Sequence, residues 1–226
     1  MKELSEATKI PQSGIRRMFD LAKNKTDVIS FCLGEPDFDT PQYIIDAGKD
    51  ALDRGSTHYT DNAGKIDFRK AVSEYVEDFD HIKYDPETEI CACAGAMEGL
   101  YLTMTVLLNP GDEVIVADPC YPNYLAQIEM NHGVPVTVPV YEKDGFNFLE
   151  ENLEKAITEK TKAILLNSPT NPTGGVADHE ILEGIARVAI RHDLFVIQDA
   201  VYKQLIYDEQ DYDCLLYTSD AADEAR

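Results

Sequence analysis

Residues 162–199 read KAILLNSPTNPTGGVADHEILEGIARVAIRHDLFVIQD, and this stretch decides the fold. It begins with a short apolar run at 162–166, continues through a loop rich in Asn, Pro and Thr, and enters a helical pattern over 178–192. A second apolar run follows at 194–198. A strand, a helix and a strand in this order predict a right-handed βαβ unit whose two strands run parallel.

The same alternation of apolar runs and helical patterns extends over most of the chain. Further strands are predicted at 89–94, 113–117 and 134–140. Further helices are predicted, after a polar N-terminal arm, at 42–54, 65–79, 97–108, 122–131 and 150–158. These elements favour the α/β class, with a mostly parallel sheet that carries helices on both faces.

Composition and charge exclude several classes of protein and several kinds of partner. The chain has 226 residues, 44% of them hydrophobic, which suffices for one domain or most of a larger one and excludes collagen and disordered tails. Its 42 acidic and 20 basic residues give a formal net charge of −22, so we expect no nucleic-acid partner and no membrane partner. No apolar run approaches the roughly 20 residues of a membrane helix. No secretory signal is visible either, so a cytoplasmic location is expected.

The five cysteines are expected to be reduced thiols, because the sequence shows no secretory signal. Cys91 and Cys93 would share one face of a strand, which leaves a metal pair open as an alternative. The sequence has no second Cys or His pair at zinc spacing. The pattern therefore favours buried thiols and no metal site.

Polar and aromatic residues follow the predicted strands, where an open parallel sheet binds its ligands. They supply a glycine turn that opens a helix, an aromatic ring, an amide, a carboxylate and a phenol. In chain order these residues are Gly95, Ala96, Met97, Tyr121, Asn171, Asp199 and Tyr202. Such a set suits a flat, phosphorylated, heteroaromatic ligand.

Three of these features have a physical reason and an ordinary alternative. Backbone N–H groups after Gly95 could hold a phosphate at a helix N-terminus, although glycine at such a turn is often only steric. Tyr121 could stack on an aromatic ligand, or simply pack against its neighbours. Asp199 ends a buried apolar run and needs a cationic partner, such as a protonated pyridine nitrogen, unless it caps a helix or pairs with an arginine.

Several short motifs occur in an order that points to one family. They are SGIR at 13–16, GEPDFDTP at 34–41, HYT at 58–60 with AG at 63–64, NPGD at 109–112 and NSPTNPTG at 167–174, followed by Asp199 and Tyr202. Over residues 13–212 the sequence resembles the class I and II aminotransferases, which are pyridoxal 5′-phosphate (PLP) enzymes of fold type I. The resemblance implies the large domain of that fold.

The resemblance also implies roles for the residues at the strand ends. The amides of Ala96 and Met97, at the Gly95 turn, would hold the phosphate of PLP. Tyr121 would stack on the pyridine ring, and Asp199 would keep the ring nitrogen protonated. In addition, Asn171 and Tyr202 would hydrogen-bond the phenolic oxygen of the ring.

Substrate and subunit contacts are implied in the same way. Gly34 and Asn171 would lie at the substrate, with Gly34 near its carboxylate, and the substrates would be an amino acid and a 2-oxo acid. Tyr59 would reach the phosphate of a neighbouring subunit, because family members are homodimers with shared active sites.

Departures from the family pattern imply an incomplete site. None of the lysines lies in the Ser-rich motif of the family's Schiff-base lysine, so no catalytic residue is assigned, and Lys203 is expected at the surface. We expect a truncated, inactive chain in three parts. Residues 1–40 would be an arm with part of the small domain, and 41–213 a partial PLP-binding large domain. Residues 214–226, which resemble a translated sequencing adapter, would be a non-native tail.

The resulting hypothesis is that the parent protein is a PLP-dependent aminotransferase. One alternative is a carbon–sulfur β-lyase of the same fold. Another is a non-enzymatic PLP-binding α/β module. A dinucleotide site is unsupported, because no G-x-G-x-x-G pattern follows a strand.

Overall fold

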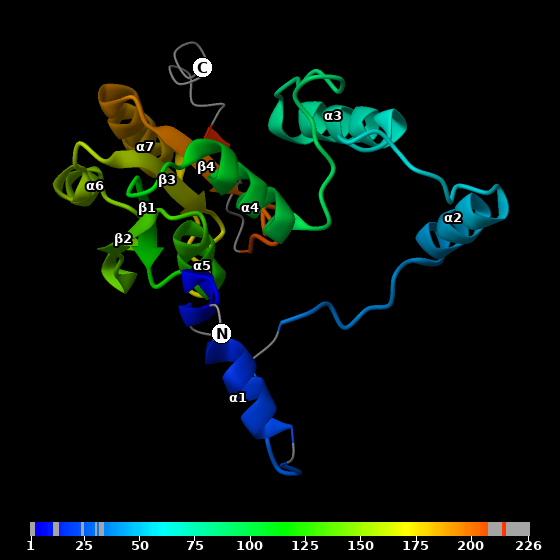
Figure 1. The fold of residues 1–226 in the computed structure, drawn as a ribbon, viewed down its shortest axis with the longest axis horizontal. Helices are drawn as coiled ribbons and strands as arrows, with labels where there is room; N and C mark the ends of the chain where they lie inside the picture. Colours follow the sequence, from blue (N-terminus) through cyan, green and yellow to red (C-terminus); the bar gives the residue numbers. More distant parts are fainter. Residues whose placement is uncertain are drawn as a thin grey trace.

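The computed structural model describes residues 3–10, 14–23, 25–29, 31, 34–207 and 214–215. At its centre is a four-stranded parallel sheet with the strand order β2-β1-β3-β4 (Figure 1). The strands are β1 (Glu113–Asp118), β2 (Val134–Pro139), β3 (Thr161–Asn167) and β4 (Phe195–Asp199). The predicted parallel sheet is therefore confirmed, and all four strands lie within a residue or two of the predicted positions.

The connections reverse direction at the middle of the sheet. After β1, helix α5 (Pro122–Met130) leads to β2 on one side. From β2 the chain passes through η2 (Glu142–Asp144) and α6 (Glu150–Ala156) to β3, on the other side of β1. Helix α7 (His179–His192) then leads to β4. The point between β1 and β3 is thus a topological switch, where doubly wound sheets bind their ligands.

Helices cover both faces of the sheet, as predicted. Alternate residues of β1 enter two separate layers, because successive side chains of a strand point to opposite faces. Val114 and Val116 pack in the layer beneath α4 (Ala96–Leu107) and α5. Ile115 packs in the layer beneath α6 and α7, together with Leu153 and Leu182. All five side chains are fully buried.

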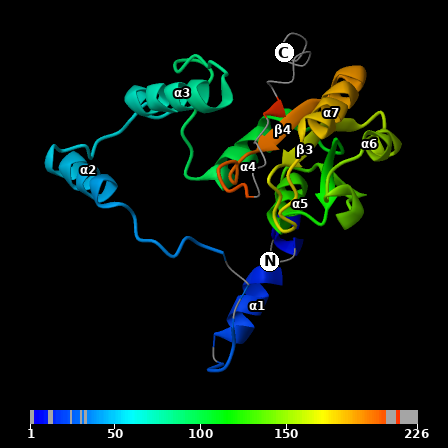
Figure 2. The ribbon, with the colours of Figure 1, turned by 180° about the vertical axis from the view of Figure 1, so that it is seen from behind.

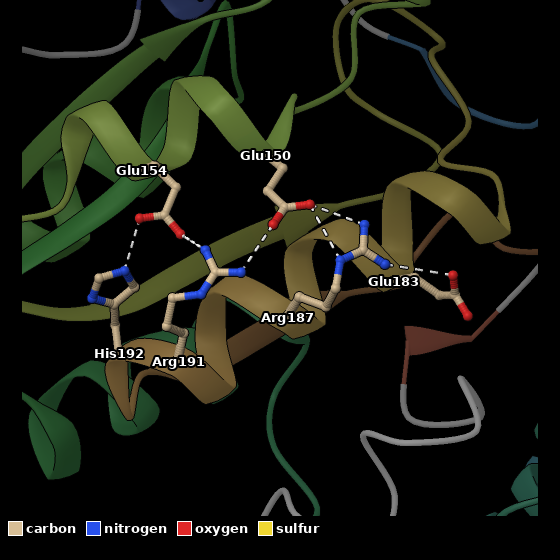
Figure 3. A network of polar contacts seen from close by, with 6 residues as sticks. All are labelled: Glu150, Glu154, Glu183, Arg187, Arg191 and His192. Atoms are coloured by element: carbon tan, nitrogen blue, oxygen red, sulfur yellow. Dashed lines mark hydrogen bonds and ion pairs between the residues drawn. The ribbon is translucent and has the colours of Figure 1, made fainter.

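A network of charged side chains joins α6 to α7 at the surface (Figure 3). Its members are Glu150, Glu154, Glu183, Arg187, Arg191 and His192. Glu150 Oε2 accepts from Arg187 at 2.9 Å, and Glu154 Oε2 lies 2.9 Å from His192 Nε2. These contacts join the outer faces of two helices whose inner faces already share the core.

The N-terminal part of the chain contains η1 (Glu6–Lys9), α1 (Gly14–Ala22), α2 (Gln42–Asp53) and α3 (Ile66–Asp80). Figures 1 and 2 show α1 and α2 lying away from the sheet in both views. No residue of α2 is buried. Helices α2 and α3 confirm the predicted helices at 42–54 and 65–79, whereas α1 falls within the predicted polar arm.

Two expectations about residues 89–94 are wrong. Residues 89–94 form no strand, because a strand requires a neighbour to complete its ladder, and no strand in the described part of the chain pairs with them. Instead, the Ala92 N–H donates to the Ala63 carbonyl at 2.9 Å. Since the segment is open, Cys91 is exposed and Cys93 is partly exposed rather than buried.

No helix among the described residues is long and apolar enough to cross a membrane. No group of three or more His, Cys, Asp or Glu side chains in the same residues could hold a metal ion. Of the residues at 214–226, the described pair is Cys214 and Leu215, and Leu215 is buried in the layer beneath α6 and α7.

Candidate functional site

The loops that follow β3 and β4 meet at the carboxyl edge of the sheet. Asn167 and Asp199, the last residues of these strands, are register partners. The Asn167 side chain donates from Nδ2 to the Asp199 carbonyl at 2.9 Å, and its Oδ1 accepts from the Asn171 N–H at 2.8 Å. One side chain therefore holds the backbone of Asn171 beside the backbone of Asp199.

The carboxylate of Asp199 is half-buried and held by two donors. The Tyr124 hydroxyl donates to Oδ2 at 2.8 Å, and the Val201 N–H donates to Oδ1 at 3.2 Å. Burial, followed by the negative charge of Asp199, raises the pKa of Tyr124 far above its usual value. The phenol consequently stays protonated and acts as a donor. Among the described residues, Asp199 forms no ion pair with arginine, which was one of the alternatives open from the sequence.

Gly95 forms a tight turn at the start of α4. Its φ of 83° lies in the left-handed region, which an L side chain rarely adopts. The Glu98 carboxylate closes the turn by accepting the N–H of Ala94. Ala96 and Met97 stand in the first helical turn, where backbone N–H groups have no intrahelical acceptor. The turn is exposed, so these two amides are available to an anion.

Helix α5 places three polar side chains against the predicted site residues. The Asn123 side chain donates from Nδ2 to the Tyr121 hydroxyl at 2.8 Å. The buried Gln127 donates from Nε2 to the Met97 carbonyl at 2.8 Å. The ring of Tyr124 meets the ring of Tyr121 edge-on, with centroids 5.4 Å apart and an interplanar angle of 81°. Tyr121 is therefore oriented from two sides.

The sequence interpretation gave no role to four of these positioning residues: Asn123, Tyr124, Gln127 and Asn167. The signal that could have found Tyr124 and Gln127 is their helical spacing of three residues, which directs both polar side chains to one face of α5. That face turns out to be the buried one. A buried polar side chain needs a partner, and here both partners belong to the candidate site.

A small cavity lies beneath this edge. Its volume is about 20 Å³, which is room for roughly one water molecule. Cys120, Tyr124, Asn167 and Asn171 contribute to its lining. Burial and the charge of Asp118 raise the pKa of the Cys120 thiol to about 11, so the thiol stays protonated. The cavity is too small for an aromatic ligand, which would have to lie over the edge.

Two predicted site residues are not brought to this edge. Tyr59 is fully exposed in the loop between α2 and α3. Gly34 is exposed in the segment before α2, and no atom lies within 4 Å of the position that a Cβ would occupy. None of the hydrogen bonds found in the described part of the chain joins either residue to the sheet edge. Their roles remain predictions.

The turn after β4 carries Tyr202, which is half-buried, and Lys203. Burial is the largest cause of the raised pKa of Tyr124, and an electrostatic interaction with the Tyr202 phenol adds to it, so the two phenols lie within electrostatic reach of each other. Lys203 was expected at the surface, and this expectation is wrong. Its side chain is only 13% exposed, because it pairs with Asp80 at 2.7 Å.

Comparison with known proteins identifies relatives of this chain. The family "Aminotransferase class I and II" matches residues 26–224. An aspartate aminotransferase of Pyrococcus abyssi is 44% identical over 197 residues, which are 87% of this chain and 51% of the relative. Aromatic-amino-acid aminotransferase 2 of Thermococcus litoralis is 40% identical over 196 residues, 87% of this chain and 50% of the relative. The chain therefore spans about half the length of the curated relatives it matches.

Solved structures agree with this result. The crystal structure of Pyrococcus protein A1 superimposes with a TM-score of 0.92 at 40% identity, covering 95% of this chain and 55% of the other. The aspartate aminotransferase of Thermus thermophilus with maleate gives a TM-score of 0.90 at 32% identity, covering 97% and 58%.

Proposed function

The chain belongs to the aminotransferase class I and II family, and from this premise we propose that the full-length protein is a PLP-dependent aminotransferase. It would move an amino group between an amino acid and a 2-oxo acid. The observation that carries the proposal is the Asp199 carboxylate at the carboxyl edge of the sheet, held by the Tyr124 phenol at 2.8 Å. A carboxylate held in this way is suited to a cationic ring nitrogen.

The residues present fit both the phosphate end and the pyridine end of PLP. At one end, the first-turn amides of Ala96 and Met97 and the N-terminal dipole of α4 suit a phosphate. At the other, a carboxylate with two donors keeps lone pairs free for a protonated pyridine. When bound, PLP supplies an electron sink that stabilises negative charge at the substrate α-carbon.

In this proposal Asp199 holds the proton on the ring nitrogen. Opposite unit charges 4 Å apart attract by about 4 kcal/mol at an effective dielectric near 20, enough to favour the protonated ring at neutral pH. Tyr124 keeps the carboxylate turned toward the edge, because its hydroxyl occupies Oδ2. The Asn167 side chain holds the backbone of Asn171 close to that of Asp199, so that Asn171 would be available to the same ligand.

The remaining residues would orient the ring and exclude water from one side. Tyr121, fixed by Asn123 and by the edge of Tyr124, would present its flat face to the pyridine. Asn171 and Tyr202 would donate to the phenolic oxygen of the ring. Gly34 and Asn171 would lie at the substrate, and Tyr59 would serve the site of a second subunit in a homodimer.

The decisive experiment uses the full-length protein and the variant Asp199→Ala. We expect the wild type to turn yellow with PLP and to convert an amino acid to its 2-oxo acid, and the variant to lose both properties. Asp46→Ala, on the exposed face of α2, is the matched control. Equal colour in Asp199→Ala would overturn the proposal, and release of a thiol from a cysteine-like substrate would favour the β-lyase alternative.

The 226-residue chain by itself is expected to show no turnover. No lysine in it matches the family's covalent lysine, so no group is assigned to move the substrate α-proton. Production of 2-oxo acid is measured with the purified chain, PLP and an amino acid. Steady production would contradict this expectation.

A further inference from the structure

Lys203 occupies a cage formed by α3, and it directly follows Tyr202. Its ammonium lies 4.6 Å from the ring centroid of Tyr75 and 4.7 Å from that of Phe79. Lys203 Nζ also donates to Asp80 Oδ2 at 2.7 Å. We call these four residues, Lys203, Tyr75, Phe79 and Asp80, the lysine latch.

The lysine latch is a largely buried contact between opposite charges. The side chains of Lys203 and Asp80 are 13% and 10% exposed, and burying either charge alone would be costly. The second carboxylate oxygen, Asp80 Oδ1, is buried without a hydrogen-bond partner, so the lysine is the main compensation for that charge. Cation–π attraction adds to the ion pair, and it is strongest where the cation is shielded from water.

The latch ties α3 to the turn that carries Tyr202. Within the turn, the Lys203 N–H donates to the Ala200 carbonyl at 3.1 Å, and the Leu205 N–H donates to the Tyr202 carbonyl at 2.8 Å. A second side-chain bond, from Gln204 Nε2 to the Tyr75 hydroxyl at 2.8 Å, reinforces the attachment. A displacement of Lys203 would therefore be transmitted to Tyr202.

The opposite end of α3 is connected to the other half of the candidate site. The Ala63 carbonyl, just before α3, accepts the N–H of Ala92, which lies three residues before Gly95. Gly64 approaches the same residue so closely that an added Cβ would lie 2.6 Å from the Ala92 Cβ. Helix α3 thus contacts the turn of Tyr202, and the two residues shortly before it, Ala63 and Gly64, contact the segment leading into the Gly95 turn.

We propose that Lys203 is a positioning residue, which pins the turn at 200–205 to α3 and so holds Tyr202 in place for the cofactor. The inference rests on the proposed function, because it assigns Lys203 a task at the same PLP site. Lys203 itself does not touch the cofactor in this proposal. Its ammonium is committed to Asp80 and the two rings.

The test uses the full-length protein and pyridoxamine 5′-phosphate as the probe. This amine form of the cofactor has no aldehyde and cannot label surface lysines. Lys203→Met keeps the apolar stem and loses the charge, whereas Lys203→Arg keeps a cation that can stack and pair. Lys155→Met is the matched control, because Lys155 forms an ion pair with Glu151 in which both side chains are 70% exposed.

Two readouts are measured well below the melting temperature. We expect Lys203→Met to weaken binding of the probe by about tenfold and to speed amide hydrogen exchange at 200–205 by about as much. Asp80→Asn should act in the same direction. Lys203→Arg should restore both values, and Lys155→Met should change neither.

Two other outcomes would overturn the proposed role of Lys203. Unchanged exchange at 200–205 in Lys203→Met would show that the latch does not hold the turn. Faster exchange with unchanged probe affinity would leave Lys203 a purely structural residue and overturn the positioning role. An Asp199→Ala arm separates the two proposals: if it binds the probe as well as the wild type, the cofactor site is wrong, while the exchange data still decide whether the latch holds the turn.

Discussion

Helices α2 and α7 both carry apolar residues at helical spacing, yet they bury them very differently. Leu182, Ile185 and Val188 of α7 are at most 1% exposed. Tyr43 and Leu52 of α2 are 75% and 66% exposed, and no residue of α2 is buried. The difference shows that an amphipathic pattern indicates only that one face of a helix can be buried. Whether it is buried depends on another element that covers it.

The largest effect should come from removing a core side chain on the α7 side of the sheet. Ile164→Ala deletes a side chain that is 0% exposed, and we expect it to lower the free energy of unfolding by about 2–5 kcal/mol. Leu52→Ala, on α2, should change it by no more than about 0.5 kcal/mol. Urea denaturation measures both. Similar losses in the two variants would break the comparison, since they would mean that α2 is covered in solution.

The next largest loss of stability should come from breaking the hydrogen bond between Tyr124 and Asp199 at the sheet edge. Tyr124→Phe removes the donor to Asp199, and a hydrogen bond to a charged group contributes about 1.5–3 kcal/mol. Tyr43→Phe, on the exposed face of α2, is the matched control and should be neutral. Thermal unfolding and affinity for pyridoxamine 5′-phosphate are the readouts. A Tyr124→Phe protein as stable as the control would argue against a structural role for this bond.

Glycine-to-alanine substitutions should change the free energy of unfolding in opposite directions at the Gly95 turn and in α2. Gly95→Ala forces a side chain into the left-handed region, at a cost of about 1–2 kcal/mol, and should also weaken binding of the phosphate. Gly48→Ala, inside the exposed α2, should instead stabilise the helix by about 0.5–1 kcal/mol. Circular dichroism during thermal unfolding tests both. No gain from Gly48→Ala would indicate that α2 is not helical when it lacks a covering element.

The smallest effect is expected from acid acting on the α6–α7 network of Figure 3. A hydrogen bond from Arg187 lowers the pKa of Glu150 below its usual 4.5, and a hydrogen bond with His192 lowers the pKa of Glu154. Because both folded-state pKa values are depressed, their stabilisation is present above the unfolded value. It is lost as the pH falls through the folded pKa values.

The variant Glu150→Gln/Glu154→Gln should therefore show a flatter decline of melting temperature on acidification than the wild type. Glu151→Gln is the control, because Glu151 is 70% exposed and outside the network. A decline as steep as that of the wild type would mean that other carboxylates dominate the acid sensitivity.

Much of the sheet could be predicted from the sequence, because its strands are short apolar runs bounded by polar loops. Strand β4 and helix α7 differ from their predicted bounds by one residue. Residues 89–94 have the same local pattern but form no strand, since pairing depends on a neighbour that local pattern does not reveal. Lys203 was misplaced for a related reason: a lysine is normally exposed, and only the arrangement of α3 encloses it.

The sequence by itself determined the α/β class, the parallel strands and the residues at the strand ends, because apolar periodicity and turn chemistry are local properties. Only the tertiary structure decided which of those residues meet. Tyr124 reaches Asp199 across 75 positions of the chain, and Lys203 reaches Asp80 across 123. Contacts of that kind follow from the strand order and the packing of helices, which bring distant polar groups together where burial requires each to have a partner.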